Sequence, residues 1–113
     1  MITIEALKDF GADVSEGMAR CLNKEDFYLK MVNMGLNDAR FNTIKDALDA
    51  KDLDTAFEMA HALKGVLGNL ALTPIFKPVS EMTELLRTRT DTDYTPLYTE
   101  MKAQYDKLLA LKD

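Results

Sequence analysis

The sequence is poor in glycine, proline and cysteine, and each shortage narrows the class of protein. Five glycines and three prolines among 113 residues leave few helix breakers, while Leu, Ala, Met, Lys, Glu and Asp dominate. This composition favours helix over strand. The single cysteine, Cys21, cannot form an internal disulfide, and one cysteine with one histidine cannot build a structural zinc site.

Basic stripes and long apolar runs are also missing. The formal net charge is -5, and no cluster of Lys or Arg offers the surface that nucleic acid or an anionic membrane requires. No apolar run approaches the length of a membrane span, and the start "ITIEALKDF" lacks the features of a secretory signal. We therefore expect a cytoplasmic protein with no nucleic-acid or membrane partner. A chain of this length, 47% hydrophobic, predicts one domain over residues 1–113.

Apolar residues recur at helical spacing between short turn-forming stretches. The expected helices cover residues 3–10, residues 14–22 leading into 25–36, and residues 38–50. Their predicted apolar sets are Ile4, Leu7 and Phe10; Phe27, Met31, Met34 and Leu36; and Phe41, Ile44 and Leu48.

Capping signals mark the later helices. Asp52 is a predicted N-cap, and Thr73 with Pro74 is a predicted cap and first-turn pair. Pro78, one turn later, is expected to delay the start of that helix or to bend it. The last helix, from residue 93 or 94 to 111, aligns Leu97, Met101, Tyr105, Leu108 and Leu111. Four long patterns with short connections predict an all-α fold, an antiparallel up-and-down four-helix bundle with short N-terminal helices packed over one end.

The only histidine, His61, lies within "AHALKGVLGNL", residues 60–70. A rotation of about 100° per residue places the core stripe opposite this histidine. The stripe comprises Ala56, Met59, Leu63, Val66, Leu67 and Leu70, and the residues on the histidine's own side are Phe57, Lys64, Gly65 and Gly68. His61 is therefore expected to be exposed.

Gly65 and Gly68 interrupt this helix, and each costs about 0.5–1 kcal/mol relative to alanine. Bare backbone beside an imidazole lets another macromolecule approach the ring closely. A side chain at Gly68 is expected to point at that partner and away from the core. Lys64 adds a cation on a flexible stem that can reach an anion held at His61.

The pattern His-x-Leu-Lys-Gly with a later Gly, formed here by His61, Leu63, Lys64, Gly65 and Gly68, resembles the histidine phosphotransfer (HPt) domain. The similarity covers nearly the whole chain, including "DVSEGMARCLNKEDFYLKMV" before the motif and "SEMTELLR" after it. One departure is Ala71, where the family usually has Gly. We interpret this change as slightly tighter packing.

The resemblance implies a phosphoryl carrier of bacterial two-component signalling. His61 would accept a phosphoryl group from an aspartyl phosphate on a response-regulator receiver domain, such as that of a hybrid histidine kinase, and pass it to another receiver. Neutral imidazole has the lone pair that such a nucleophile needs. Lys64 would offset phosphoryl charge, and Gly65, Gly68 and Phe57 would form the docking surface. We expect a monomer.

The family's imidazole often receives an orienting hydrogen bond from the following helix. Thr83 and Glu84 are both candidates by position, and a water would also serve. The acidic residues have spacings typical of helix faces and caps, so we expect no cofactor or metal on this chain, and magnesium would be bound by the receiver. No Gly-rich ATP loop is present, so we expect no kinase activity.

Two alternatives stay open. The first is a docking module that binds a receiver-like partner without carrying phosphate. The second is a haem protein with His61 and a methionine as axial ligands. The candidate methionines lie at or beside apolar positions, where core packing is their ordinary role: Met18, Met31, Met34, Met59, Met82 and Met101.

Overall fold

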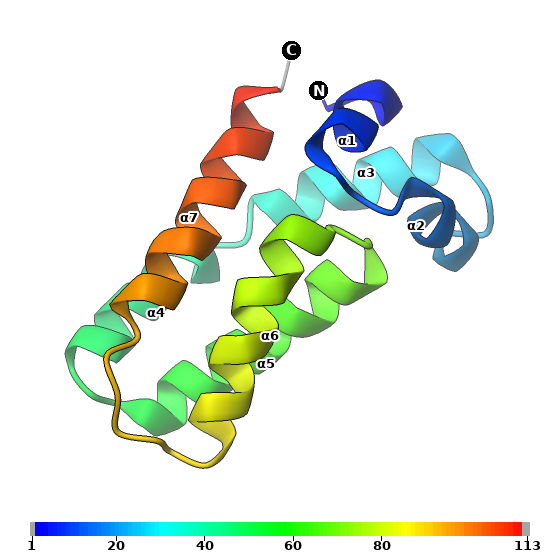
Figure 1. The fold of residues 1–113 in the computed structure, drawn as a ribbon. Coiled ribbons are helices and arrows are strands. Elements are labelled where there is room, and N and C mark those ends of the chain that lie inside the picture. Colours follow the sequence, from blue (N-terminus) through cyan, green and yellow to red (C-terminus); the bar gives the residue numbers. More distant parts are fainter. Residues whose placement is uncertain (1, 112–113) are drawn as a thin grey trace.

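Seven helices follow one another in residues 2–111, the part of the chain that the computed structural model describes (Figure 1). They are α1 (Ile4–Phe10), α2 (Val14–Arg20), α3 (Glu25–Leu36), α4 (Arg40–Asp49), α5 (Leu53–Asn69), α6 (Thr73–Arg87) and α7 (Thr95–Ala110). These residues include no strand, and the predicted all-α class is confirmed.

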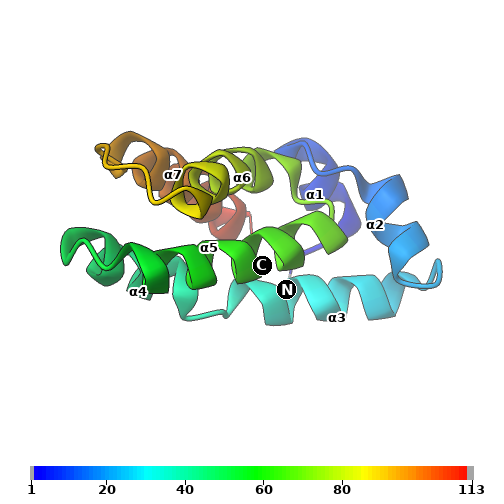
Figure 2. The same cartoon turned by 90° about the horizontal axis from the view of Figure 1, so that it is seen from below.

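The helices α4 to α7 form the bundle. α5 packs against α4 on one side and α6 on the other, and α6 packs against α7. Figure 2 shows α3 and α4 following one another along one side of α5, with α6 along the other side. The short helices lie at one end, where α1 contacts α7 and α2 contacts α3. The predicted antiparallel bundle with N-terminal helices over one end is confirmed.

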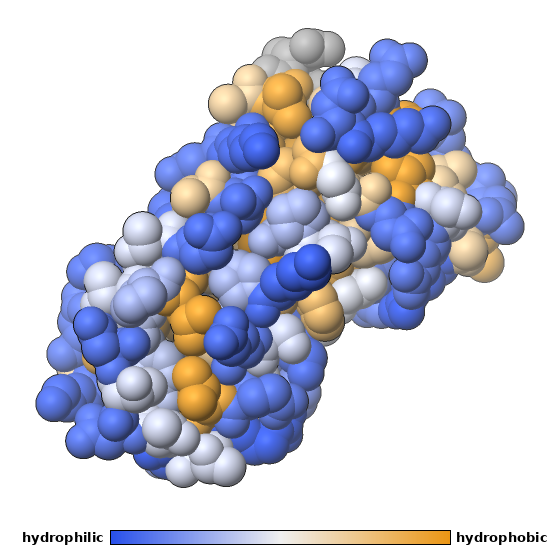
Figure 3. Space-filling view, viewed as in Figure 1, coloured by the Kyte–Doolittle hydropathy of each residue, from blue (hydrophilic) through white to orange (hydrophobic). Residues whose placement is uncertain are grey.

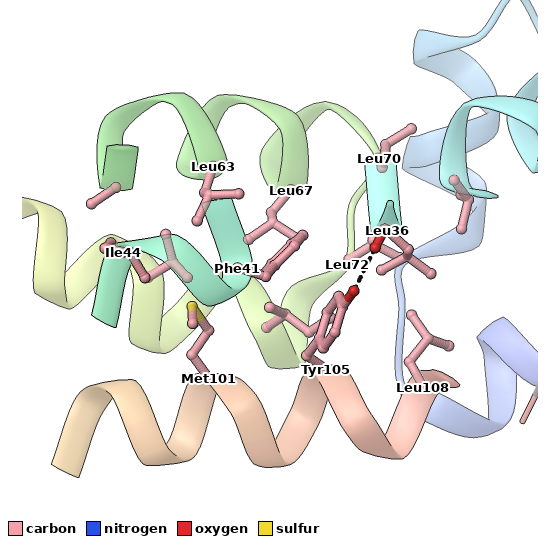
Figure 4. Packing of buried hydrophobic residues seen from close by; sticks show 14 of the residues in the cluster. Leu36, Phe41, Ile44, Leu63, Leu67, Leu70, Leu72, Met101, Tyr105 and Leu108 are labelled. Carbon is pink, nitrogen blue, oxygen red and sulfur yellow. Dashed lines mark hydrogen bonds between the residues drawn. The ribbon is translucent and has the colours of Figure 1, made fainter. Parts of the chain in front are cut away.

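The core lies between the apolar faces of α4, α5, α6 and α7. In Figure 4, Leu63 and Leu67 of α5 approach Phe41, and Tyr105 of α7 closes the layer from below. The Phe41 and Tyr105 rings stack with centroids 4.4 Å apart, and the Tyr105 hydroxyl donates to the Leu36 carbonyl. This bond connects α7 to the end of α3, and it gives the buried hydroxyl the hydrogen-bond partner that a buried polar group needs.

The outer faces of the helices are polar. Figure 3 shows mostly hydrophilic atoms, with hydrophobic atoms visible in patches between them. Among the residues described, no helix has the length and apolar character that crossing a bilayer requires.

Helix starts match the predicted caps in part. The Asp52 carboxylate accepts a hydrogen bond from the Thr55 amide and caps α5 as predicted. The prediction for α6 is wrong by one residue, because Leu72 is its N-cap and the Thr73 hydroxyl donates instead to the Ala71 carbonyl. Pro78 lies buried inside α6 and does not delay its start.

The predicted buried face of α3 is largely wrong. Tyr28, Val32 and Leu36 are buried, whereas Phe27 is 42% exposed and Met34 is 57% exposed. Tertiary contacts select this face, because the Tyr28 hydroxyl donates to the Leu70 carbonyl at 2.9 Å.

The Tyr28 ring also packs directly over Gly17 of α2. A Cβ at Gly17 would lie 2.5 Å from the ring. At the other end of the chain, Leu108 of α7 is buried as predicted, but Leu111 is 39% exposed because α7 ends at Ala110. The buried face of α3 and the exposure of Leu111 both differ from the predicted pattern. The first depends on tertiary contacts and the second on where a helix ends, and apolar periodicity predicts neither.

Candidate functional site

α5 carries the predicted site on its outer face. Ala56, Ala60, Leu63 and Leu67 are buried, so this helix presents the opposite side to solvent. His61 is exposed on that side, as the helical rotation predicts. Two members of the predicted core stripe, Met59 and Val66, are half-buried at its edge.

His61 borders a shallow hollow of about 250 Å³. The hollow is lined by Arg20, His61, Lys64, Gly65, Gly68, Asn69 and Phe76. A larger hollow of about 730 Å³ lies between the α4–α5 turn and the α6–α7 loop, but its lining includes none of the predicted site residues. The smaller hollow therefore brings together four of the predicted residues, His61, Lys64, Gly65 and Gly68.

The two glycines have different surroundings. A Cβ built at Gly65 would have no heavy atom of another part of the protein within 4 Å, so the backbone there is open to an approaching partner. A Cβ at Gly68 would lie 3.3 Å from Cε2 of Phe76, a half-buried residue of α6. A Gly68 side chain, expected to point at the partner and away from the core, would therefore also lie in close contact with the edge of the Phe76 ring.

Phe57, one turn before His61, contacts the imidazole directly. The two rings stack with centroids 5.5 Å apart and planes inclined by 25°. The guanidinium groups of Arg87 and Arg89 lie over the Phe57 ring at 5.3 Å and 4.9 Å from its centroid. Phe57 is therefore a packing partner of the ring, and both arginines lie close to the predicted site.

Glu84 connects the predicted cation to one of these arginines. Its Oε1 lies 3.4 Å from Lys64 Nζ, and its Oε2 accepts a hydrogen bond from Arg87 Nε at 2.9 Å. The Arg87 guanidinium first, and then the Lys64 ammonium, hold the pKa of the Glu84 carboxyl below its usual value. Glu84 is thus a charged bridge between cations on either side of the histidine's turn.

Neither candidate for orienting the imidazole bonds to it within residues 2–111. Thr83 is fully buried, and its hydroxyl donates to the Val79 carbonyl at 2.7 Å. The Glu84 carboxylate binds Lys64 and Arg87 instead. Within the described residues, the imidazole instead stacks on the Phe57 ring.

Ala71 lies where α5 ends, with φ of 55° in the left-handed region. The Leu72 amide donates to the Leu67 carbonyl and the Ala71 amide to the Gly68 carbonyl, the hydrogen-bond pair of a Schellman motif. Glycine is the residue that adopts this conformation without strain. The interpretation of Ala71 as tighter packing therefore leaves out a second feature of the position, its left-handed backbone conformation.

The sequence does not predict that three arginines, Arg20, Arg87 and Arg89, lie near the site. Arg20 of α2 donates to the Asn69 side chain at 3.4 Å, and Arg89 pairs with Asp54 at 2.6 Å. The i,i+3 spacing of Glu84 and Arg87 is a readable signal for a pair on one helix. No local pattern reveals that the α5–α6 packing places Arg87 and Arg89 over Phe57.

A helical bundle that exposes one histidine, with a lysine one turn further and bare backbone beside it, has the features of a phosphotransfer carrier. The family comparison agrees: a model of the Hpt domain matches residues 36–111, most of the chain. The protein belongs to the Hpt domain family, whose members are phosphocarriers that work with response-regulator receivers in phosphorelays. No curated protein and no solved structure matches the chain significantly.

Proposed function

We propose that His61 accepts a phosphoryl group from the aspartyl phosphate of one receiver domain and passes it to the aspartate of another. The observation that carries the proposal is the exposed imidazole beside Gly65, where a Cβ would meet nothing within 4 Å. A receiver must bring its aspartate within bonding distance of the ring, and this open backbone admits it. The single histidine of the chain leaves one imidazole for the role.

The transfer is a displacement at phosphorus. The lone pair of a neutral ring nitrogen attacks the phosphorus atom, a nitrogen–phosphorus bond forms, and the bond to the aspartate oxygen breaks. The receiver's carboxylate leaves with the bonding electrons. Transfer to the second receiver is the same step in reverse, so the chain needs no nucleotide of its own.

The site's charges suit this step. Lys64, one turn beyond His61, offsets the negative charge that the phosphoryl group brings. Two carboxylates near the site are already paired, Glu84 with Lys64 and Arg87, and Asp54 with Arg89. We therefore assign the magnesium ion of the reaction to the receiver, whose aspartate is the phosphoryl donor.

The stack of Phe57 on His61 supplies orientation. A stacked aromatic neighbour restricts rotation of the imidazole about its side-chain bonds and leaves its edge free for attack. Pre-positioning of this kind reduces the ordering that docking has to impose. Phe57 therefore acts on transfer through His61, and its contacts with the receiver are secondary.

The test incubates the full chain with a panel of radiolabelled, phosphorylated receivers. We expect at least one receiver to transfer label to the chain, as phosphate that is lost in acid and retained in base. His61→Gln should take up no label. A docking-only module would bind the receiver in a pull-down but stay unlabelled, and a haem protein would show a Soret absorbance band; either result would refute the proposal.

A further inference from the structure

Glu84 occupies a position that the transfer step does not explain. It lies on α6 and reaches across to Lys64 of α5, and its second oxygen binds Arg87 one turn further along α6. A carboxylate beside a site that must receive a phosphoryl dianion is unfavourable by simple charge repulsion. Its presence calls for a role in which the negative charge is useful.

The same contacts show how the negative charge acts. Lys64 and Arg87 flank the turn of α5 that carries His61: Lys64 follows the histidine by one turn, and Arg87 lies over Phe57, which precedes it by one turn. Glu84 draws both cations together on the α6 side. The third cation of this group, Arg89, is held by Asp54 and lies over the same Phe57 ring.

The two ion pairs of Glu84 differ in strength. Arg87 Nε lies 2.9 Å from Oε2, a good hydrogen-bond distance, whereas Lys64 Nζ lies 3.4 Å from Oε1, at the long limit. The ammonium group of Lys64 is a point charge on a flexible stem, whereas Arg87 binds through a planar guanidinium group. Lys64 is therefore the member of the bridge that is released most easily.

We propose that Glu84 is the resident counter-anion of this site, which a phosphoryl group on His61 displaces from Lys64 and then from Arg87. The inference rests on the proposed function and deepens it. In the unphosphorylated chain the two cations are neutralised by Glu84; in the phosphorylated chain they turn to the phosphoryl oxygens. Glu84 thereby sets how much phosphate the carrier retains when it equilibrates with a receiver, and it is a positioning residue because it acts through Lys64 and Arg87.

The test compares Glu84→Gln with Glu81→Gln, a matched control. Glu81 lies one turn earlier on α6, is exposed, and has no ion pair within residues 2–111. Each full-length variant is equilibrated with the same phosphorylated receiver. The measured quantity is the ratio of label on the variant to label on the receiver. We expect Glu84→Gln to shift the label towards the chain by about two- to fivefold, the range of exposed charge pairs, and Glu81→Gln to match the wild type.

Two further readouts separate a charge effect from a structural one. The shift caused by Glu84→Gln should shrink at high salt, which screens exposed charges, and should shrink in a Lys64→Ala background, because one competing cation is then absent. The phosphorus NMR signal of the phosphorylated chain should titrate at lower pH in Glu84→Gln than in Glu81→Gln, since the freed cations favour the phosphoryl dianion.

The outcomes distinguish the two levels of the proposal. If no receiver labels the wild-type chain, the proposed function fails. If the wild type is labelled but Glu84→Gln and Glu81→Gln partition alike, the transfer stands and the role of Glu84 is wrong. Should Glu84→Gln not fold by circular dichroism, Glu84→Asp replaces it: its shorter side chain cannot span both cations, so a smaller shift in the same direction is expected, and no shift overturns the inference.

Discussion

A side chain at Gly65 should raise stability and reduce transfer at the same time. Gly65 lies one turn beyond His61, and a Cβ there would meet no heavy atom within 4 Å. Gly65→Gln therefore removes the glycine penalty of about 0.5–1 kcal/mol without a steric cost. In a domain of this size the gain should raise the melting temperature by roughly 2–6 °C.

The reduced transfer follows from the same open position. The new side chain extends over the hollow that borders His61, where a receiver's aspartate must approach. His61 and Lys64 are unchanged, so chemistry with a small phosphodonor such as phosphoramidate should be nearly normal. Transfer from a phosphorylated receiver should fall by tenfold or more, a loss of about 1.4 kcal/mol in the transition state.

Gly68 is the matched control, because it lies on the same face of α5 but has Phe76 as a close neighbour, whereas Gly65 has none. A Cβ there would lie 3.3 Å from Cε2 and 3.8 Å from Cδ2 of Phe76. Gly68→Ala must displace this ring slightly, so its helix-propensity gain is largely offset. Gly68→Gln overfills the contact and should destabilise the protein by about 1–3 kcal/mol.

Urea melts paired with transfer time courses measure both quantities for each variant. The expected pattern is a stable, transfer-deficient Gly65→Gln beside a destabilised Gly68→Gln. A destabilised Gly65→Gln, or a stable one that accepts label from the receiver at the wild-type rate, would show that Gly65 is not kept for access.

Three other predictions follow from single contacts. Lys64→Ala should fold normally and slow receiver transfer by about tenfold; a rate unchanged at low and high salt would refute its role. Ala71→Gly should raise the free energy of unfolding by about 1 kcal/mol in a urea melt, because Ala71 has φ of 55°; a loss would mean that the methyl group's packing outweighs the strain. Burial raises the pKa of Tyr28 to about 12, so the folded state keeps a proton that the unfolded chain loses, and stability is full below about pH 10 and falls towards pH 12. Between about pH 9 and about pH 11, urea melts should show a smaller loss of unfolding free energy for Tyr28→Phe than for the wild type. Equal losses would show that Tyr28 is not the group responsible.

Periodicity predicts most of the fold because the helices of the bundle bury continuous apolar faces. α5 is the best case, since Asp52 caps it and four of its apolar residues are fully buried. α3 fails because Phe27 and Met34 are as apolar as Tyr28 and Val32, so sequence hydrophobicity does not choose between the two faces. The buried face includes Tyr28, whose hydroxyl donates to the Leu70 carbonyl, a partner distant in sequence that only the folded chain brings within reach.

In the candidate site, too, features of a single helix are predictable from the sequence and contacts between helices are not. Helical rotation is sufficient to predict that His61 is exposed and that Lys64 and Gly65 lie on its side. The rotation predicts the direction of a side chain but not which residues of another helix lie there. It therefore does not predict the contact of Phe76 with Gly68 or the ion pair of Glu84 with Lys64. The left-handed backbone of Ala71 depends on where α5 ends, and the residue type at one position does not reveal it.

The most direct test of His61 as the phosphoryl carrier is phosphorus NMR of the full chain after transfer from a phosphorylated receiver. We expect one phosphoramidate signal whose phosphorus couples to imidazole ring protons, and no such signal from His61→Gln. Because an exposed substitution changes stability by less than about 0.5 kcal/mol, the variant should unfold like the wild type and serve as a folded control. A phosphorus signal coupled to any other side chain, or one that survives in His61→Gln, would contradict the assignment of His61.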